Sequence, residues 1–197
     1  MSAGPPGDLV TSRVLATFLS VVSSRPAAEV VDLGPALGAN IAFLGERIGC
    51  KIHVADLYAE LDRHAQEGTL DRFTELLAER FAGLDERIDA VLCWDVFDYL
   101  APAAAGVLAG RLVQALRPGG ALLAFFGAGA LGERGYTRYV IEDETHFRCR
   151  LSNAACGRQQ VLQNRDILRL FTGLDLFDSL LLKSGVREVL FRKPDPT

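Results

Sequence analysis

The segment A-E-V-V-D-L-G-P-A-L-G, residues 28–38, sets the architecture of this chain. Its first half is a short apolar run with adjacent valines, which is typical of a strand buried on both faces of a parallel sheet. Gly34 then lets the backbone turn sharply, and Gly38 lets the following helix approach closely. The N-terminus of that helix favours negative charge, such as the carboxylate of a ligand. A strand, a glycine turn and a helix in this order predict an α/β fold.

The rest of the chain continues the alternation of strands and helices. Apolar runs bounded by turn residues predict strands over 28–33, 51–57, 87–94, 121–126, 176–182 and 187–192. Helical periodicity predicts helices over 8–22, 41–49, 58–67, 102–116 and 164–171. The segment 69–81 suits a helix better than a strand. Right-handed crossovers then give a mostly parallel sheet with helices on both faces, closed by an antiparallel hairpin around Lys183-Ser184-Gly185.

The composition limits the classes of protein to consider. The chain has 197 residues, 49% hydrophobic and 23% charged, which suits one domain spanning 1–197 with residues 1–7 disordered. A net charge of −4 argues against a nucleic-acid partner. No apolar run is long enough to span a membrane, and residues 1–8 lack the basic and apolar pattern of a signal peptide, so we expect a cytoplasmic protein without one. The four cysteines lack zinc-site spacing, and reduced thiols are expected.

Polar residues follow the first two strands at their carboxyl ends, where open α/β sheets bind ligands. The first of these strands ends on Asp32, before the Gly34 turn, and the second ends on Asp56. A carboxylate some twenty residues past a glycine loop is placed to accept hydrogen bonds from ribose hydroxyls. The alternative is that Asp56 simply caps the helix that follows it.

Four segments, in order, resemble the motifs of class I S-adenosylmethionine-dependent methyltransferases. They are V-V-D-L-G-P-A-L-G, H-V-A-D-L, I-D-A-V-L-C-W-D-V-F-D-Y-L and L-R-P-G-G-A-L-L-A-F-F. The resemblance runs from about Ala28 to the C-terminus and includes the closing hairpin. It implies a three-layer sandwich with a seven-stranded sheet, S-adenosyl-L-methionine as cofactor, and methyl transfer to an acceptor.

The resemblance also implies roles for individual residues. The methionine half of the cofactor would be lined by Asp32, Gly34, Ala36 and Gly38. Asp56 would bind the ribose and Leu57 would pack on the adenine, while the residues beside the sulfonium would be Cys93, Trp94 and Asp95. The chain departs from the family's pattern at Ala36, which replaces the middle glycine of the motif. The third strand and its acidic residue are not placed, and Asp71, Glu75 and Glu79 remain equivalent candidates for that acid.

Two alternative functions stay open. A nicotinamide dinucleotide enzyme is disfavoured, because the loop lacks the second glycine that lets the backbone meet a pyrophosphate. A catalytically degenerate methyltransferase fold, kept as a binding or partner-interaction module, is favoured by Ala36 and the missing third-strand acid. The sequence leaves the oligomeric state open.

We expect the part of the site that binds the methyl acceptor to lie in the longest connection, residues 127–163. We interpret this connection as a lid-like insertion that carries selectivity for a small-molecule acceptor. Its glycine-rich start would allow it to hinge. Tyr139 is a candidate for acceptor contact and His146 for proton removal, since a histidine has a suitable unperturbed pKa. A surface role for His146 is the alternative. We expect no metal, because Asp95 and Asp98 lack a third nearby ligand.

Overall fold

The computed structural model describes residues 7–127 and 129–196. The predicted disorder of residues 1–7 therefore falls, apart from Gly7, outside the described residues. The main sheet has six strands in the order β3-β2-β4-β5-β9-β8. Their bounds are β3 (Lys51–Val54), β2 (Glu29–Asp32), β4 (Ile88–Trp94), β5 (Leu116–Phe126), β9 (Arg187–Arg192) and β8 (Asp175–Leu181). Strands β3, β2, β4 and β5 are parallel, and β9 runs antiparallel to both β5 and β8.

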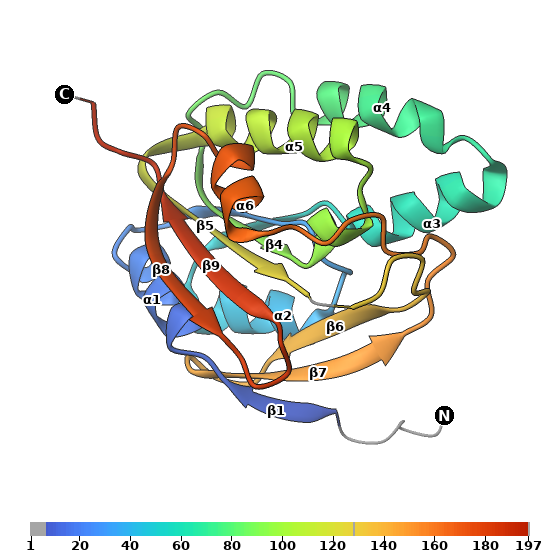
Figure 1. The fold of residues 1–197 in the computed structure, drawn as a ribbon. Helices are drawn as coiled ribbons and strands as arrows, with labels where there is room; N and C mark the ends of the chain where they lie inside the picture. The colour runs from blue at the N-terminus through green and yellow to red at the C-terminus, as the bar shows by residue number, and fades with distance from the viewer. Residues whose placement is uncertain (1–6, 128, 197) are drawn as a thin grey trace.

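Helices cover both faces of this sheet (Figure 1). One face carries α3 (Leu57–Glu67), α4 (Phe73–Arg80), α5 (Pro102–Ala115) and α6 (Asn164–Leu170). The other carries α1 (Arg13–Ser23), α2 (Gly38–Ala42) and the π-helical stretch η1 (Phe43–Ile48). Two 3-10 turns, η2 (Leu70–Arg72) and η3 (Val96–Tyr99), complete the helical elements of the described residues. The predicted three-layer arrangement is thus present.

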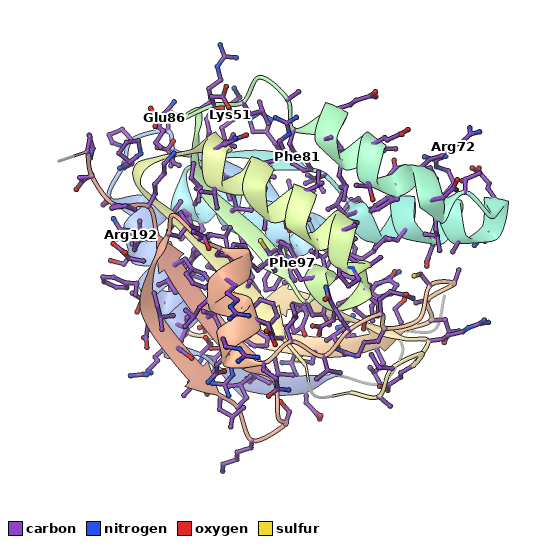
Figure 2. The ribbon with its side chains drawn as sticks, turned by 45° about the horizontal axis from the view of Figure 1, so that its top comes forward. Lys51, Arg72, Phe81, Glu86, Phe97 and Arg192 are labelled. Carbon is purple, nitrogen blue, oxygen red and sulfur yellow. The ribbon has the colours of Figure 1, made fainter. Side chains whose placement is uncertain are left out.

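Two separate apolar clusters form the core, one on each face. Strand β4 is buried along its whole length, and its alternating side chains divide between the clusters: Val91 and Cys93 join one, Leu92 and Trp94 the other. Figure 2 shows Phe97 in the interior below α5, whereas Arg72 lies at the outer end of the arm formed by α3 and α4. The alternation follows from the two-residue period of a strand.

The predicted strand count is wrong, because the main sheet has six strands in the described part of the chain and not seven. The segment between β3 and β4, where a third strand would come, folds as η2 and α4. Its apolar residues recur at helical spacing, and α4 buries two of them, Phe73 and Leu77, against the core. Strand β3 consequently forms one edge of the sheet.

A second, three-stranded antiparallel sheet was not predicted. Its order is β1 (Asp8–Thr11), β7 (His146–Ser152), β6 (Tyr136–Ile141). The helix expected from residue 8 begins instead at Arg13, because Ser12 caps it by accepting a hydrogen bond from Leu15 N–H at 2.9 Å. The expected insertion 127–163 therefore contributes a hairpin, β6–β7, which the N-terminal strand extends.

Candidate functional site

Asp32 of β2, Gly34 of the loop after it and Trp94 of β4 meet at the carboxyl ends of these two strands. Asp32 Oδ1 accepts hydrogen bonds from Gly34 N–H at 2.9 Å and from the Trp94 indole N–H at 2.7 Å. The Asp32 carboxyl is almost fully buried, and this burial raises its pKa to about 6. The chain leaves β2 toward β3 on one side and returns to β4 on the other, so these residues lie at the switch point of the sheet.

The indole of Trp94 fills the space directly over the loop after β2. A Cβ placed on Gly34 would lie 2.5 Å from Trp94 Cδ1 and 2.7 Å from Nε1. The ring stacks on Tyr139 with centroids 5.2 Å apart and planes at 5°, and meets Phe125 edge-on. Trp94 adopts a φ of 50°, in the left-handed region that bulky residues seldom occupy. We call Asp32, Gly34 and Trp94, with the loop 34–38, the cradle.

Asp56, two residues after strand β3, is hydrogen-bonded to the loop of the cradle. Its Oδ1 accepts from Ala59 N–H at 3.1 Å and caps α3, while its Oδ2 accepts from Ala36 N–H at 3.2 Å. Capping, one of the two roles open from sequence, is thus present in the structure. The carboxylate is only half-buried, so its oxygens keep further acceptor capacity toward the solvent side.

Two expected contacts are placed differently. Gly38 begins α2 and is exposed, with no atom within 4 Å of the Cβ it lacks. The close backbone approach expected at Gly38 therefore occurs at Gly34. Leu57, expected against an adenine, is fully buried in the core cluster around α3 and α4.

Asp95, just beyond β4, accepts hydrogen bonds from two tyrosine hydroxyl groups. The hydroxyl of Tyr58 donates to Asp95 Oδ1, and that of Tyr139 donates to Oδ2 at 3.3 Å. Burial raises the pKa of Asp95 to about 6, although the bond from Tyr58 opposes the shift. Tyr58 was missed from sequence because it lies on a polar helix; its ring packs on Tyr136 of the insertion, which no local pattern reveals.

Asp98 forms a buried ion pair with Arg158. Arg158, like Tyr58, was not predicted from the sequence as a residue of this region. Gly127 N–H donates to Asp98 Oδ2 at 2.8 Å, and the Arg158 guanidinium bonds the same oxygen. Burial raises the pKa of Asp98 to about 7 against the opposing charge of Arg158. The pair fixes both ends of the insertion near η3. No group of three or more potential ligand side chains in residues 7–127 and 129–196 is arranged to hold a metal ion.

The insertion covers the cradle through β6. Asn40 of α2 donates from Nδ2 to the carbonyl of Tyr139 at 2.8 Å and accepts from Ile141 N–H at 2.9 Å. Both bonds are buried. Tyr139 is therefore held over Trp94 and beside Asp95.

The structure does not bring Cys93 or His146 into this group. Cys93 points into the opposite core cluster, where burial raises the pKa of its thiol well above the ordinary value. His146 lies at the start of β7, on the face opposite the buried Phe147. Its Nδ1 is 3.0 Å from Asp143 Oδ1 and 2.9 Å from Thr145 Oγ1, in the turn between β6 and β7.

Comparisons with known proteins identify the fold of this chain. No family model and no curated protein matches the chain. Among solved structures, an S-adenosylmethionine-dependent methyltransferase from Clostridium acetobutylicum aligns with a TM-score of 0.57 and 12% identity, over 94% of this chain and 93% of that one. The 1,6-didemethyltoxoflavin-N1-methyltransferase of Burkholderia thailandensis, solved with 1,6-didemethyltoxoflavin and S-adenosylhomocysteine, gives 0.54 and 18%, over 93% and 80%. The [4+2]-cyclase SpnF gives 0.57 and 12%, over 93% and 82%.

The chain therefore has the fold of class I S-adenosylmethionine-dependent methyltransferases, as the sequence motifs predicted. None of the helices in the described part of the chain is long and apolar enough to cross a membrane.

Proposed function

We propose that this protein binds S-adenosyl-L-methionine at the cradle and transfers its methyl group to a small-molecule acceptor. The observation that carries the proposal is the convergence of Asp32, Gly34, Asp56 and Trp94 at the switch point of a methyltransferase-type sheet. The structural likeness to the 1,6-didemethyltoxoflavin-N1-methyltransferase, which was solved with S-adenosylhomocysteine and 1,6-didemethyltoxoflavin, supports both parts of the proposal.

The residues present fit the cofactor at its ribose end. Asp56 is half-buried and accepts two backbone hydrogen bonds, so it is fixed in place while its oxygens keep the capacity to accept bonds from ribose hydroxyls. At the methionine end, Asp32 and the loop 34–38 would line the ligand only after the Trp94 indole leaves the space over Gly34. Rotation of Trp94 is thus part of the proposed binding step.

When bound, the cofactor supplies an electrophilic methyl group on a sulfonium. What the chain adds is position and a proton acceptor. Asp95 lies next to Trp94, excluded from water, with its pKa raised to about 6, which makes it a stronger base than an ordinary aspartate. Tyr139 bridges Asp95 and the Trp94 ring, so it is placed to contact an acceptor. We propose Asp95 for proton removal in preference to His146, which the fold leaves in a turn.

A specific observation favours a second function, a binding module without methyl transfer. The cradle is filled by the chain's own Trp94, bonded to Asp32 and stacked under Tyr139. Such a closed arrangement suits a fold that no longer admits the cofactor. The likeness to a cyclase also illustrates that one fold serves different chemistry.

Ligand titration separates these two functions. Trp94 is the only tryptophan of the chain, so its fluorescence reports directly on the cradle. We expect S-adenosylmethionine and S-adenosylhomocysteine to bind, as measured by calorimetry, and to shift the Trp94 emission as the indole moves. Asp56→Asn keeps a residue that caps helices well but loses the charge; we expect about 5–100-fold weaker binding, the scale of a charged hydrogen bond.

Asp175→Asn is the matched control, since Asp175 is exposed on β8 and the charge change is the same. If neither ligand binds the unmodified protein, the binding-module function stands and the methyltransferase is rejected. Unchanged affinity in Asp56→Asn alone would reject the ribose contact.

A further inference from the structure

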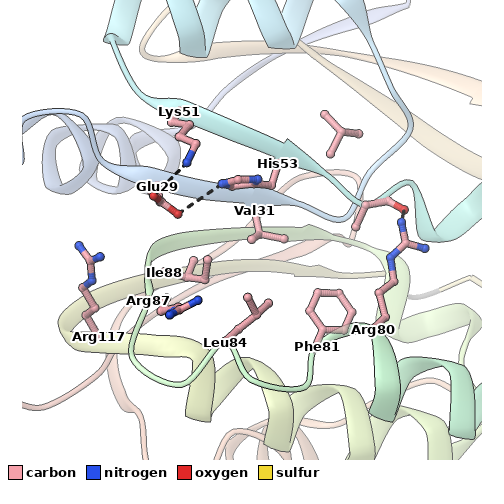
Figure 3. A pocket seen from close by; sticks show the side chains of 12 residues that line it. Glu29, Val31, Lys51, His53, Arg80, Phe81, Leu84, Arg87, Ile88 and Arg117 are labelled. Carbon is pink, nitrogen blue, oxygen red and sulfur yellow. Dashed lines mark hydrogen bonds and ion pairs between the residues drawn. The ribbon is translucent and has the colours of Figure 1, made fainter.

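A cavity of about 510 Å³ lies away from the cradle, on the sheet face that α4 and α5 partly cover (Figure 3). Its floor is made by β2 and β3, whose parallel register pairs Glu29 with Lys51 and Val31 with His53. Since side chains alternate along a strand, these four share one face. The connection from α4 to β4 forms the opposite wall with Phe81, Leu84 and Arg87 (Figure 3).

The missing strand explains why this space exists. The main sheet ends at β3, because the segment before β4 forms α4 in the described structure. Beyond the end of α4, the chain returns to β4 through a short connection that does not reach β3. With one more strand beyond β3, the connection to β4 would cover this part of the sheet. Here a cavity remains instead, lined by the apolar residues Val31, Phe81, Leu84 and Ile88.

The lining carries an excess of positive charge. Five basic residues and a single carboxylate line it: Lys51, His53, Arg80, Arg87, Arg117 and Glu29. Glu29 is shared by Lys51 at 3.2 Å and His53 at 3.4 Å. Arg80 donates to the carbonyl of Ala55 at 2.6 Å, and Arg117 contacts Asp89 at 3.2 Å.

Arg87 differs from these neighbours, because its side chain is exposed and its guanidinium has no hydrogen-bond or ion-pair partner among the described residues. Figure 3 places Arg87 and Arg117 at one end of the cavity and Phe81 at the other. A ligand bearing an anionic group at the arginine end would have an apolar wall for the rest of its body. The volume is within the range of sites for small organic molecules.

The cavity is separate from the cradle. Glu29, Lys51 and Arg87 mark the amino ends of β2, β3 and β4, whereas Asp32, Asp56 and Trp94 mark the carboxyl ends. Val31 faces the cavity and the next residue, Asp32, enters the cradle. The lining extends along β3 to Val54 and Ala55, next to Asp56, so it is a ligand at the arginine end that would be distinct from the cofactor.

We propose that this cavity binds a small amphiphilic organic anion. Its aromatic or aliphatic body would lie on Val31, Phe81 and Leu84, and its anionic group would bond the Arg87 guanidinium, at the end of the cavity where Arg117 also lies. Arginine pairs with carboxylates and phosphates through two parallel N–H bonds, so both anion types suit this end. The proposal does not depend on methyl transfer or on cofactor binding.

Fluorescence titration with 8-anilinonaphthalene-1-sulfonate tests this directly, because the probe combines an aromatic body with an anionic group. N-phenyl-1-naphthylamine is the neutral counterpart with the same rings. We expect saturable binding of one sulfonate probe per chain, and at least about 5-fold weaker binding in Arg87→Gln, since charge-assisted bonds are lost. The neutral probe should bind equally to both proteins.

Arg165→Gln is the matched control, since Arg165 is highly exposed on α6 and the charge change is identical. An equal loss in both variants, or no loss in Arg87→Gln, would overturn the proposal. Competition by benzoate and by phenyl phosphate identifies the preferred anion. Saturating S-adenosylhomocysteine should leave the probe bound; its displacement would place the probe in the cradle and reject a separate site.

Discussion

At Gly34 the backbone passes so close to the Trp94 indole that a side chain has no room. The methyl carbon of an alanine would lie 2.5 Å from Trp94 Cδ1 and 3.0 Å from Asp32 Oδ1. Both of these neighbours are packed in place without the ligand, Trp94 by stacking on Tyr139 and Asp32 by two donors. The glycine is therefore required by tertiary contact and not by an unusual φ, since Gly34 is not among the positive-φ glycines of the described residues.

Gly34→Ala should lower the free energy of unfolding by about 1–3 kcal/mol, the usual cost of overpacking a tight site, and should shift the emission of Trp94. Gly38→Ala is the matched control. It has open space around its Cβ and lies at the start of α2, so stability should change by less than about 1 kcal/mol. Urea unfolding followed by far-UV circular dichroism measures both variants. Equal stabilities for the two would contradict the close approach at Gly34.

At the scale of elements, one polar side chain of α2 holds the strand β6 of the insertion. Asn40 exchanges two buried hydrogen bonds with the backbone of β6, at Tyr139 and Ile141. Strand β6 in turn pairs with β7, and β7 with β1. Asn40 therefore joins this small three-stranded sheet to α2.

Asn40→Ala should loosen β6 without unfolding the main sheet, because two buried backbone groups lose their partners. Hydrogen exchange followed by mass spectrometry should show faster exchange over 136–141 and little change over β4 and β5. Thr17→Ala is a suitable control, since the Thr17 hydroxyl bonds only within its own exposed helix turn. If exchange over β6 stays unchanged in Asn40→Ala, the two Asn40 bonds do not hold the strand, and its pairing with β7 and its apolar packing suffice.

At the scale of the whole molecule, several buried carboxyls are harder to ionise than in the unfolded chain. Burial raises the pKa of Asp32 and Asp95 to about 6, and that of Asp98 and Glu188 to about 7. The unfolded chain releases these protons near pH 4, so the folded state binds more protons between pH 4 and 7. Their contribution to stability is thus complete below pH 4 and is lost as the pH rises through 6 to 7.

Glu188→Gln isolates one of these groups outside the cradle. Glu188 is fully buried, and its Oε2 accepts from the Ser12 hydroxyl at 2.6 Å, which an amide oxygen can also do. Denaturation at a series of pH values should show a shallower fall in stability from pH 4.5 to 7, by on the order of 1–3 kcal/mol. Exposed Glu75 provides the control Glu75→Gln, which should follow the unmodified protein. A Glu188→Gln curve parallel to that of the unmodified protein would show that Glu188 is ionised throughout.

Local sequence determined most of the elements, because their signals are short-range. The valine-rich run before Asp32, the Pro118-Gly119-Gly120 entry to the next strand and the hairpin turn at Gly185 fall where β2, β5 and the β8–β9 pair are found. Each depends on side-chain period and turn chemistry within a few residues. The motifs also placed Asp32 and Asp56 at the carboxyl ends of neighbouring strands.

Tertiary structure alone decided what surrounds those residues. Residues 8–11 form the strand β1 because they pair with β7, far along the chain. Local periodicity carries no information about that partner, and it indicated a helix for the same residues. The Asp98–Arg158 pair and the Tyr58–Asp95 contact join segments that share no sequence pattern. The position of Trp94 over Gly34 depends on its φ and on Tyr139 behind it, neither of which a one-dimensional motif encodes. Strand and turn identity is local, whereas the filling of a cavity is set by long-range packing.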